Sequence, residues 1–305
     1  MKKIDFHVHC EEALPIEKSK ENFQGMMDRN GYCGVCVMAI NYNSLGDHPH
    51  ANEDALKVIE GLGESYAFGT LYHDRDFVEQ AKELMDRGFS GIKLLDGKPS
   101  VYRKYGYGFE NPRYEAFFAY AEKHQIPLDI HNNDPLKHWD KEKCGARAIE
   151  RGWYYDETIP SQKWFYDVLE QKVLAKHPNL RVALAHMGFY AHTLDKAEEL
   201  METYPNLYMD ATPAMLIYHE LSETPEKSER FFRKYHDRIF YGTDAHNNLT
   251  GFNLDYNNTK VEMITNFLEG SEPKELGGGI VRPIHLEREM LENIYYNNAM
   301  RFIKK

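Results

Sequence analysis

The 305-residue chain has little of what marks several large classes of protein. It has only four cysteines, too few and too scattered for the disulfide framework of a small secreted domain. No apolar run approaches the roughly eighteen residues needed to span a bilayer. The first residues, MKKIDFHVHC, are too polar for a signal peptide. These absences favour a cytoplasmic protein with no membrane partner.

Basic residues are outnumbered as well. The chain has 37 lysine and arginine residues against 48 aspartate and glutamate residues, a formal net charge of −11 at pH 7. Nucleic-acid-binding proteins carry a basic patch or stripe that attracts phosphates, so we do not expect a nucleic-acid partner. No G-x-G-x-x-G motif follows an apolar run, which argues against a dinucleotide site. We therefore expect a small-molecule substrate.

What the chain does have is a regular succession of short apolar runs, each followed by a longer helix-like segment. There are eight such runs, at residues 4–9, 34–40, 66–72, 91–96, 127–132, 181–188, 206–211 and 239–245. Alternating strands and helices predict an α/β fold with a parallel sheet, and eight units predict a (β/α)8 TIM barrel. No Pro/Gly/Ser-rich linker or repeat interrupts the pattern, so we expect residues 1–305 to form a single domain.

Two segments are longer than a barrel needs. They cover residues from about 132 to 162 and from about 245 to 285, and each follows the carboxyl end of a predicted strand. Barrel enzymes place their active sites on that side, so we expect both segments to form long loops near a site.

The first strand, IDFHVH, contains two histidines separated by one residue. Strict alternation would place Ile4, Phe6 and Val8 on the face that meets the helices, and His7 and His9 inside the barrel. Buried imidazoles without partners are costly, so another group must satisfy them there.

Other predicted strands also end in polar residues. Alternation places Lys93 of GIKLLD and His131 of PLDIH inside the barrel. In VALAH, we expect Ala183 and Ala185 to pack against helices, which leaves His186 inside. The last strand, IFYGTD, ends with an aspartate.

The imidazole and carboxylate groups at these strand ends are donors that suit a divalent ion of the zinc type. The candidates are His7, His9, His131, His186 and Asp244. The plainer alternatives are hydrogen-bonded core histidines and, for Asp244, a helix N-cap. Convergence of all five groups on a metal explains the whole pattern more economically.

These residues and several longer stretches resemble the amidohydrolase superfamily, and in particular its amidohydrolase-2 branch. The stretches include GFSGIKL, LAHMG, YPNLYMDAT and RIFYGTDA, and the resemblance covers nearly the whole chain. It implies H-x-H on the first strand, histidines on the fifth and sixth, and aspartate on the eighth. Because the chain begins at the first strand, we expect no flanking β-sandwich.

The resemblance implies one zinc ion held by His7, His9, His131 and Asp244. Asp244 would move a proton between water and the leaving group, and His186 would orient the substrate, move protons or bind a second metal. Lys93 would either be a cation near the substrate or, if carboxylated, bridge two ions; Mn²⁺ is an alternative metal.

The implied function is hydrolysis of a lactone or amide by metal-activated water. The alternative is a non-oxidative decarboxylase of a small unsaturated or aromatic acid, as in relatives of the same branch. A third reading is a non-catalytic barrel with a structural metal, against which the full ligand set argues.

The segment at 132–162 mixes aromatic rings with lysines and arginines. Long loops of this kind tend to be lids or binding segments, and rings with cations suit an anionic or sugar-like substrate. We therefore expect Trp139 and Arg147, together with Lys93, to contact the substrate. The same composition would also suit the interface of a homodimer.

Overall fold

Nine parallel strands form a single sheet in the computed structural model of the chain, which describes residues 1–10, 14–43, 46–214 and 216–304. The sheet order is β10-β9-β8-β7-β6-β5-β2-β1-β11. The strands are β1 (Ile4–His9), β2 (Gly34–Met38), β5 (Tyr66–Gly69), β6 (Gly91–Gly97), β7 (Leu128–Asn132), β8 (Val182–Leu184), β9 (Leu207–Asp210), β10 (Ile239–Phe240) and β11 (Ala245–His246).

The sheet closes on itself because its two edge strands belong to one segment, residues 239–246. β10 pairs with β9, and β11 pairs with β1. Between them, the Phe6 amide donates to the Tyr241 carbonyl at 3.0 Å, and the Asp244 amide donates to the His7 carbonyl at 2.8 Å. The predicted (β/α)8 barrel is therefore confirmed, with its last strand interrupted in the middle.

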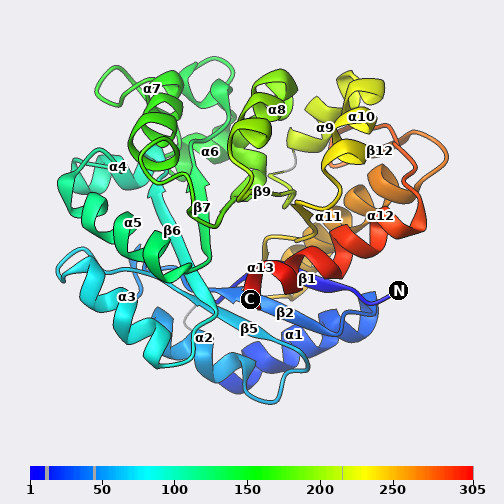
Figure 1. Cartoon of the computed structure of the whole chain (residues 1–305). Coiled ribbons are helices and arrows are strands. Elements are labelled where there is room, and N and C mark those ends of the chain that lie inside the picture. Colours follow the sequence, from blue (N-terminus) through cyan, green and yellow to red (C-terminus); the bar gives the residue numbers. More distant parts are fainter. Residues whose placement is uncertain (11–13, 44–45, 215, 305) are drawn as a thin grey trace.

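Helices surround the sheet (Figure 1). They are α1 (Ile16–Asn30), α2 (Ala51–Ile59), α3 (Phe77–Asp86), α4 (Pro99–Tyr105), α5 (Pro112–His124), α6 (Ala146–Glu150), α7 (Gln162–Val168), α8 (Leu194–Thr203), α9 (Leu216–Glu223), α10 (Pro225–Tyr235), α11 (Gly251–Glu269), α12 (Arg288–Glu292) and α13 (Asn298–Ile303). Two antiparallel pairs, β3 (Tyr42–Asn43) with β4 (Gly46–Asp47) and β12 (Lys274–Leu276) with β13 (Gly279–Val281), lie outside the barrel. No helix of the described residues is long and apolar enough to cross a membrane.

Helix α5 illustrates how the sequence forms the outer layer. Its N-cap, Asn111, accepts a hydrogen bond from the Arg113 amide at 3.1 Å, and a proline occupies the first turn. Tyr114, Phe117 and Phe118, at helical spacing, are buried. This apolar face forms part of the main core between the sheet and the helices.

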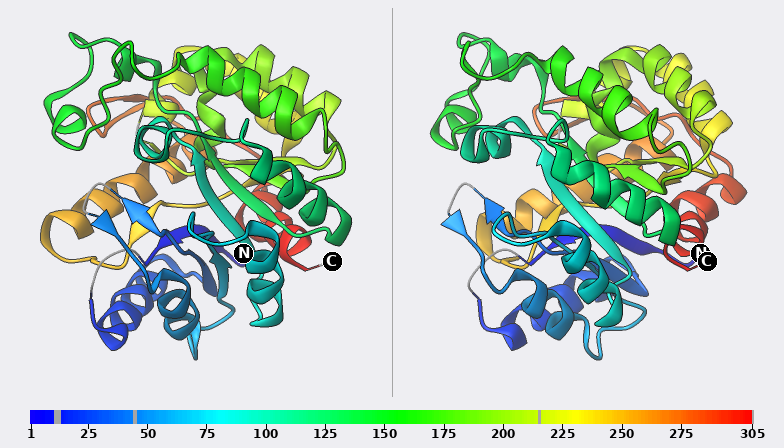
Figure 2. Two further views of the ribbon diagram at one scale, coloured as in Figure 1. Left: turned by 90° about the vertical axis from the view of Figure 1, so that its left-hand side faces the viewer. Right: turned by 60° about the vertical axis from the view of Figure 1, so that its left-hand side comes forward.

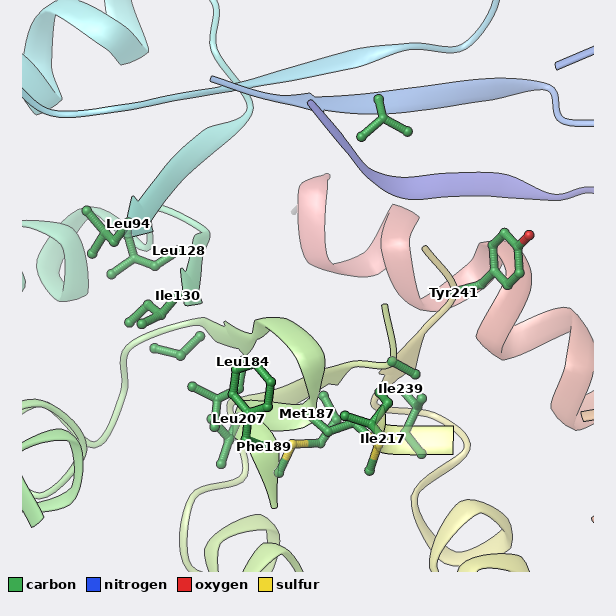
Figure 3. Packing of buried hydrophobic residues seen from close by; sticks show 14 of the residues in the cluster. Leu94, Leu128, Ile130, Leu184, Met187, Phe189, Leu207, Ile217, Ile239 and Tyr241 are labelled. Atoms are coloured by element: carbon green, nitrogen blue, oxygen red, sulfur yellow. The ribbon is translucent and has the colours of Figure 1, made fainter. Parts of the chain in front are cut away.

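The outward faces of neighbouring strands supply the other half of this core. Leu94, Leu128, Ile130 and Leu184, from β6, β7 and β8, are fully buried and lie in one band (Figure 3). Their registers match, since Leu94 pairs with Ile130 and Ile130 with Leu184. Lys93, between outward-facing residues, points into the barrel as predicted.

The alternation predicted for β1 is wrong in its first half. The register of β1 on β2 shifts between Asp5 and Val8, where three steps of β1 span only two of β2. This bulge lets Phe6 and His7 both face inward. Phe6 packs inside the barrel, with ring centroids 4.4 Å from Phe240. Ile4 joins the same inner cluster, while Val8 faces the helices as expected.

In β8, the sixth strand predicted from the sequence, the inward and outward faces are the reverse of those predicted. Ala183 lies in the inner cluster with Phe6, whereas Val182 and Leu184 belong to the outer core. The strand ends at Leu184, and a turn follows in which His186 has a φ of 55° and Met187 one of 52°. His186 therefore reaches the barrel interior through a left-handed turn and not through strand alternation.

The two long segments predicted from the sequence are partly structured. Residues 132–162 contain a 3-10 turn, Leu136–Trp139, and the short helix α6. Residues 245–285 contain the long helix α11 and the β12–β13 hairpin. Both segments lie on the side of the barrel away from the chain ends (Figure 2).

Candidate functional site

Three of the predicted residues meet at the carboxyl ends of the strands. The Nε2 atoms of His7 and His9 lie 3.0 Å apart, and an Asp244 carboxylate oxygen lies 3.1 Å from His9 Nε2. One ligand atom from each of the three residues lies within 4.8 Å of the others. His9 is oriented from behind, since its Nδ1 lies 3.2 Å from the Met38 carbonyl. The cluster thus has the donor types and the spacing that a divalent ion needs.

Asp244 is presented by an unusual backbone conformation in the gap between β10 and β11. Its φ is 56°, in the left-handed region that non-glycine residues rarely adopt. The buried Lys260, on α11, donates a hydrogen bond of 2.6 Å to the Asp244 carbonyl. Just before it, Thr243 donates from its amide and hydroxyl to the buried Asp5 carboxylate. These contacts hold the aspartate against the histidines of β1.

A second polar group lies deeper in the barrel, beneath His7. The His7 Nδ1 atom is hydrogen-bonded to Asp210, and the Lys93 ammonium is paired with Asp129. Lys93 Nζ is also 3.4 Å from His7 Nε2. Buried charges need partners, and these residues supply them for each other. Asp210, at the end of β9, thus orients the His7 imidazole.

His131, on β7, and His186, in the turn after β8, lie next to the cluster formed by His7, His9 and Asp244. Their ring centroids are 4.9 Å apart, and that of His186 is 5.8 Å from that of His7. The Nε2 atom of His131 lies 3.4 Å from both Lys98 Nζ and an Asp134 carboxylate oxygen. His131 is therefore beside the three-residue cluster, and its Nε2 has polar partners of its own.

Burial keeps these imidazoles neutral. Desolvation lowers the pKa of His186 to about 4, and the positive charge of Lys93 acts in the same direction. Desolvation also lowers the pKa of His7 and His131 well below the usual value, again with help from neighbouring lysines. A neutral imidazole has a free lone pair, which is the form that binds a metal.

Asp244, in contrast to the neutral imidazoles, is held in its charged form. Burial by itself would raise its pKa, but the hydrogen bond with His9 and the charge of Lys260 hold the pKa of Asp244 well below its usual value. The site therefore combines neutral imidazoles with an ionised carboxylate. This donor set fits a divalent ion of the zinc type.

A cavity of about 1020 Å³ opens above the cluster. His9, His131, His186 and Asp244 line its inner end. Arg147, predicted to contact the substrate, lines its wall.

Trp139 has a different environment. Its indole nitrogen donates to the Pro160 carbonyl at 2.9 Å, and its ring packs against Tyr155 inside a small apolar cluster. Within the described residues, Trp153 and not Trp139 is the tryptophan at the cavity wall.

Several residues of the site were missed from the sequence. Asp129 had a usable signal, because it lies two positions before His131 and so on the same inward face of β7. Lys98 follows β6 directly, and its charge at a strand end was a weaker signal. Lys260 had no signal in the sequence, because it lies in the long helix α11, whose position over Asp244 depends on the tertiary fold.

With this geometry in view, comparison with known proteins identifies the family. A family model described as amidohydrolase, of the amidohydrolase-2 branch, matches residues 46–305. The chain belongs to the amidohydrolase family. The predicted resemblance is confirmed. Among curated proteins, a sequence search gives no match.

Solved structures of amidohydrolases share the fold over the full length of the chain. A 2,6-dihydroxybenzoate decarboxylase from Rhizobium is 15% identical, with a TM-score of 0.58 and coverage of 99% of this chain and 98% of that one. A 4-oxalomesaconate hydratase from Rhodopseudomonas palustris is 14% identical, with a TM-score of 0.58 and coverage of 99% and 95%. A dihydroxybenzoic acid decarboxylase from Polaromonas, with bound manganese and the inhibitor 2-nitroresorcinol, is 14% identical, with a TM-score of 0.59 and coverage of 99% and 97%.

Proposed function

We propose that this amidohydrolase is a metal-dependent hydrolase that opens a lactone or an amide of a small anionic molecule. One divalent ion, with zinc favoured, would be held by His7, His9, His131 and Asp244. The observation that carries the proposal is the convergence of the His7 and His9 imidazoles and the Asp244 carboxylate, with ligand atoms within 4.8 Å, at the inner end of a large cavity.

A bound ion of this type lowers the pKa of a water molecule from about 15.7 towards 7 and polarises a carbonyl group. The side chains would carry the protons. The Asp244 carboxylate, ionised and at the cavity surface, would accept a proton from the attacking water and return it to the leaving group. His186, whose Nδ1 donates to the Thr212 carbonyl at 3.1 Å, would keep an unprotonated Nε2 and position the substrate or the attacking water as a hydrogen-bond acceptor.

The surroundings of Lys93 support a single ion. Its side chain is buried and forms an ion pair with the Asp129 carboxylate. In the single-ion proposal, Lys93 stays in this pair beneath His7, whereas a carbamate that bridges two ions would require the pair to break. Manganese is an alternative metal, since one structural neighbour binds it.

The second candidate is a non-oxidative decarboxylase of a small unsaturated or aromatic acid. Two observations favour it: lysines and arginines line the cavity and suit a carboxylate substrate, and two of the structural neighbours are decarboxylases. In this reaction, the carbon that loses CO2 gains a proton, and Asp244 or His186 would take that proton from a water molecule and pass it to the carbon, which leaves hydroxide to combine with the CO2.

The test begins with the metal. We expect the wild-type protein to bind about one zinc or manganese ion per chain, and His7→Ala and Asp244→Asn to lose the ion while keeping the fold, because neither residue belongs to the apolar clusters of the core. Metal content and circular dichroism measure both effects. His124→Ala, an exposed histidine on α5, is the matched control. Full metal occupancy in both ligand variants would refute the site.

The reaction is tested next on the metal-loaded protein. Lactones, amides and unsaturated or aromatic acids are screened for product by mass spectrometry, and CO2 release is measured in parallel. Ring opening or amide cleavage without CO2 supports the hydrolase, and CO2 release supports the decarboxylase. Activity that is unchanged in Asp244→Asn would contradict both candidates.

A further inference from the structure

The cavity has a charge opposite to that of the whole molecule. Seven lysine and arginine residues line it against three carboxylates, although the chain as a whole carries a net charge of −11. Walls of one sign concentrate ligands of the other sign, because low-dielectric surroundings strengthen the field in a cleft. The excess cations lie mainly in residues 132–162, here called the lid segment, and in α4 with its N-cap Lys98.

Two arginines of the lid segment have the geometry of anion-binding groups. Arg147 and Arg151 are four residues apart at α6 and its C-terminal end, so they project from the same side. The Arg147 guanidinium lies 5.4 Å from the ring centroid of Tyr256 on α11, and that of Arg151 lies 5.3 Å from the ring centroid of Trp153. Stacking on a ring leaves the N–H edges of a guanidinium available for a carboxylate or phosphate. Neither arginine forms an ion pair with any carboxylate in the described ranges.

A chain of contacts connects these arginines with the candidate metal centre. Lys98 Nζ is 3.4 Å from His131 Nε2 and 5.0 Å from the centroid of Trp153, whose ring also contacts Arg151. His138, which is buried and lines the same stretch of cavity, has an Nδ1 atom with no hydrogen-bond partner within the described structure. Lys98 is also paired with the Asp134 carboxylate at 2.7 Å, so among the described residues the unpaired cations of this path are those of the lid segment, and side-chain contacts connect them with the strand ends.

We propose that Arg147 and Arg151 form an anion subsite that binds an acidic group of the substrate remote from the reacting carbonyl. This inference rests on the proposed function and narrows its substrate. The substrate is then a small molecule with its reacting carbonyl at His9 and Asp244 and a carboxylate or phosphate at α6. Because the subsite has two cationic side chains, it should bind dianions more tightly than monoanions.

The subsite can be tested without turnover. The chain has three tryptophans, of which Trp139 and Trp153 lie in the lid segment and Trp164 packs against it, so tryptophan emission reports on this region. The full chain is treated with a chelator and titrated at constant ionic strength with acetate, succinate, glutarate and inorganic phosphate. We expect saturable changes with the dianions and much weaker changes with acetate. A preference for the dicarboxylates over phosphate, or the reverse, identifies the acidic group.

The variants then assign the effect to the two arginines. We expect Arg147→Ala/Arg151→Ala to bind the preferred dianion about tenfold or more weakly, since a hydrogen bond to a charged group is worth roughly 1.5–3 kcal/mol. Lys141→Ala, a lid lysine outside the cavity lining, is the matched control and should bind as the wild type does. Equal binding of acetate and dianions, or equal weakening in the control, would overturn the subsite. Dianion binding by a metal-free protein that proves inactive on every substrate would leave the subsite standing and refute the proposed reaction instead.

Discussion

At the scale of single residues, the site depends on imidazoles that are held in place by other buried groups. His7 is fully buried, and its Nδ1 is hydrogen-bonded to Asp210, which in turn accepts from the Thr212 amide at 3.0 Å. A carboxylate in this position fixes the ring orientation and the tautomer, so that Nε2 presents its lone pair to the cavity side. In the proposed metal site, Asp210 would therefore help to decide how tightly an ion binds without contacting it.

Asp210→Asn tests this role. We expect the affinity for zinc or manganese to fall by about 10–100-fold, because an amide supports the His7 imidazole less well than a carboxylate does. Competition against a chromogenic chelator measures the affinity. Asp195→Asn, at an exposed aspartate on α8, is the control and should leave the affinity unchanged. Wild-type affinity in Asp210→Asn would show that the contact is only structural.

At the scale of elements, the position of each strand depends on close approaches that its residues must permit. β2 begins at Gly34, where the turn before β5 crosses it: a Cβ atom at Gly34 would lie 2.1 Å from the Glu64 carbonyl oxygen. Because that oxygen belongs to the backbone, it cannot rotate away as a side chain would. The glycine is therefore needed for the packing of the turn against the strand.

Gly34→Ala should lower the free energy of unfolding by about 1–3 kcal/mol, the usual cost of overpacking. Gly25→Ala is the matched control, because Gly25 lies on the exposed face of α1 with nothing within 4 Å of an added Cβ. There the substitution should raise the free energy of unfolding by about 0.5–1 kcal/mol through higher helix propensity. Urea unfolding measures both changes, and the same sign for the two would contradict this account.

At the scale of the whole molecule, the two ends of the barrel have different tasks. The amino-terminal end is filled by an apolar cluster in which Phe6, Phe68 and Phe240 meet Phe302 of the last helix, α13. The carboxyl-terminal end holds the polar cluster and the cavity. Stability and chemistry are thus supplied by different residues, which allows one to be changed without the other.

Phe302→Ala should lower the stability of the protein without changing its metal affinity. We expect the free energy of unfolding to fall by about 3–5 kcal/mol, because a large buried ring is removed from the barrel interior. Metal affinity of the folded protein should remain at the wild-type level. Ile280→Ala, at a residue 44% exposed on β13, should change stability by less than about 0.5 kcal/mol. Loss of metal affinity in folded Phe302→Ala would show that the two ends are coupled.

The sequence alone was sufficient for the fold and for most of the polar strand ends. Eight short apolar runs separated by helical segments have few arrangements other than a closed parallel barrel, and the predicted fold was confirmed. Polar residues at the ends of such runs stand out because buried strands are otherwise apolar. His7, His9 and Asp244 were recognisable for this reason, and the structure brings their ligand atoms together.

The tertiary structure decided the details that side-chain alternation along a strand, with its period of two residues, cannot predict. A bulge in β1 turned Phe6 inward beside His7, and a left-handed turn carried His186 to the site after β8 had ended. Lys260 meets Asp244, and Arg147 meets Tyr256, only because α11 packs over the strand ends far from its place in the sequence. Local alternation depends on neighbouring residues, whereas these contacts depend on how the barrel closes and on what then covers its open end.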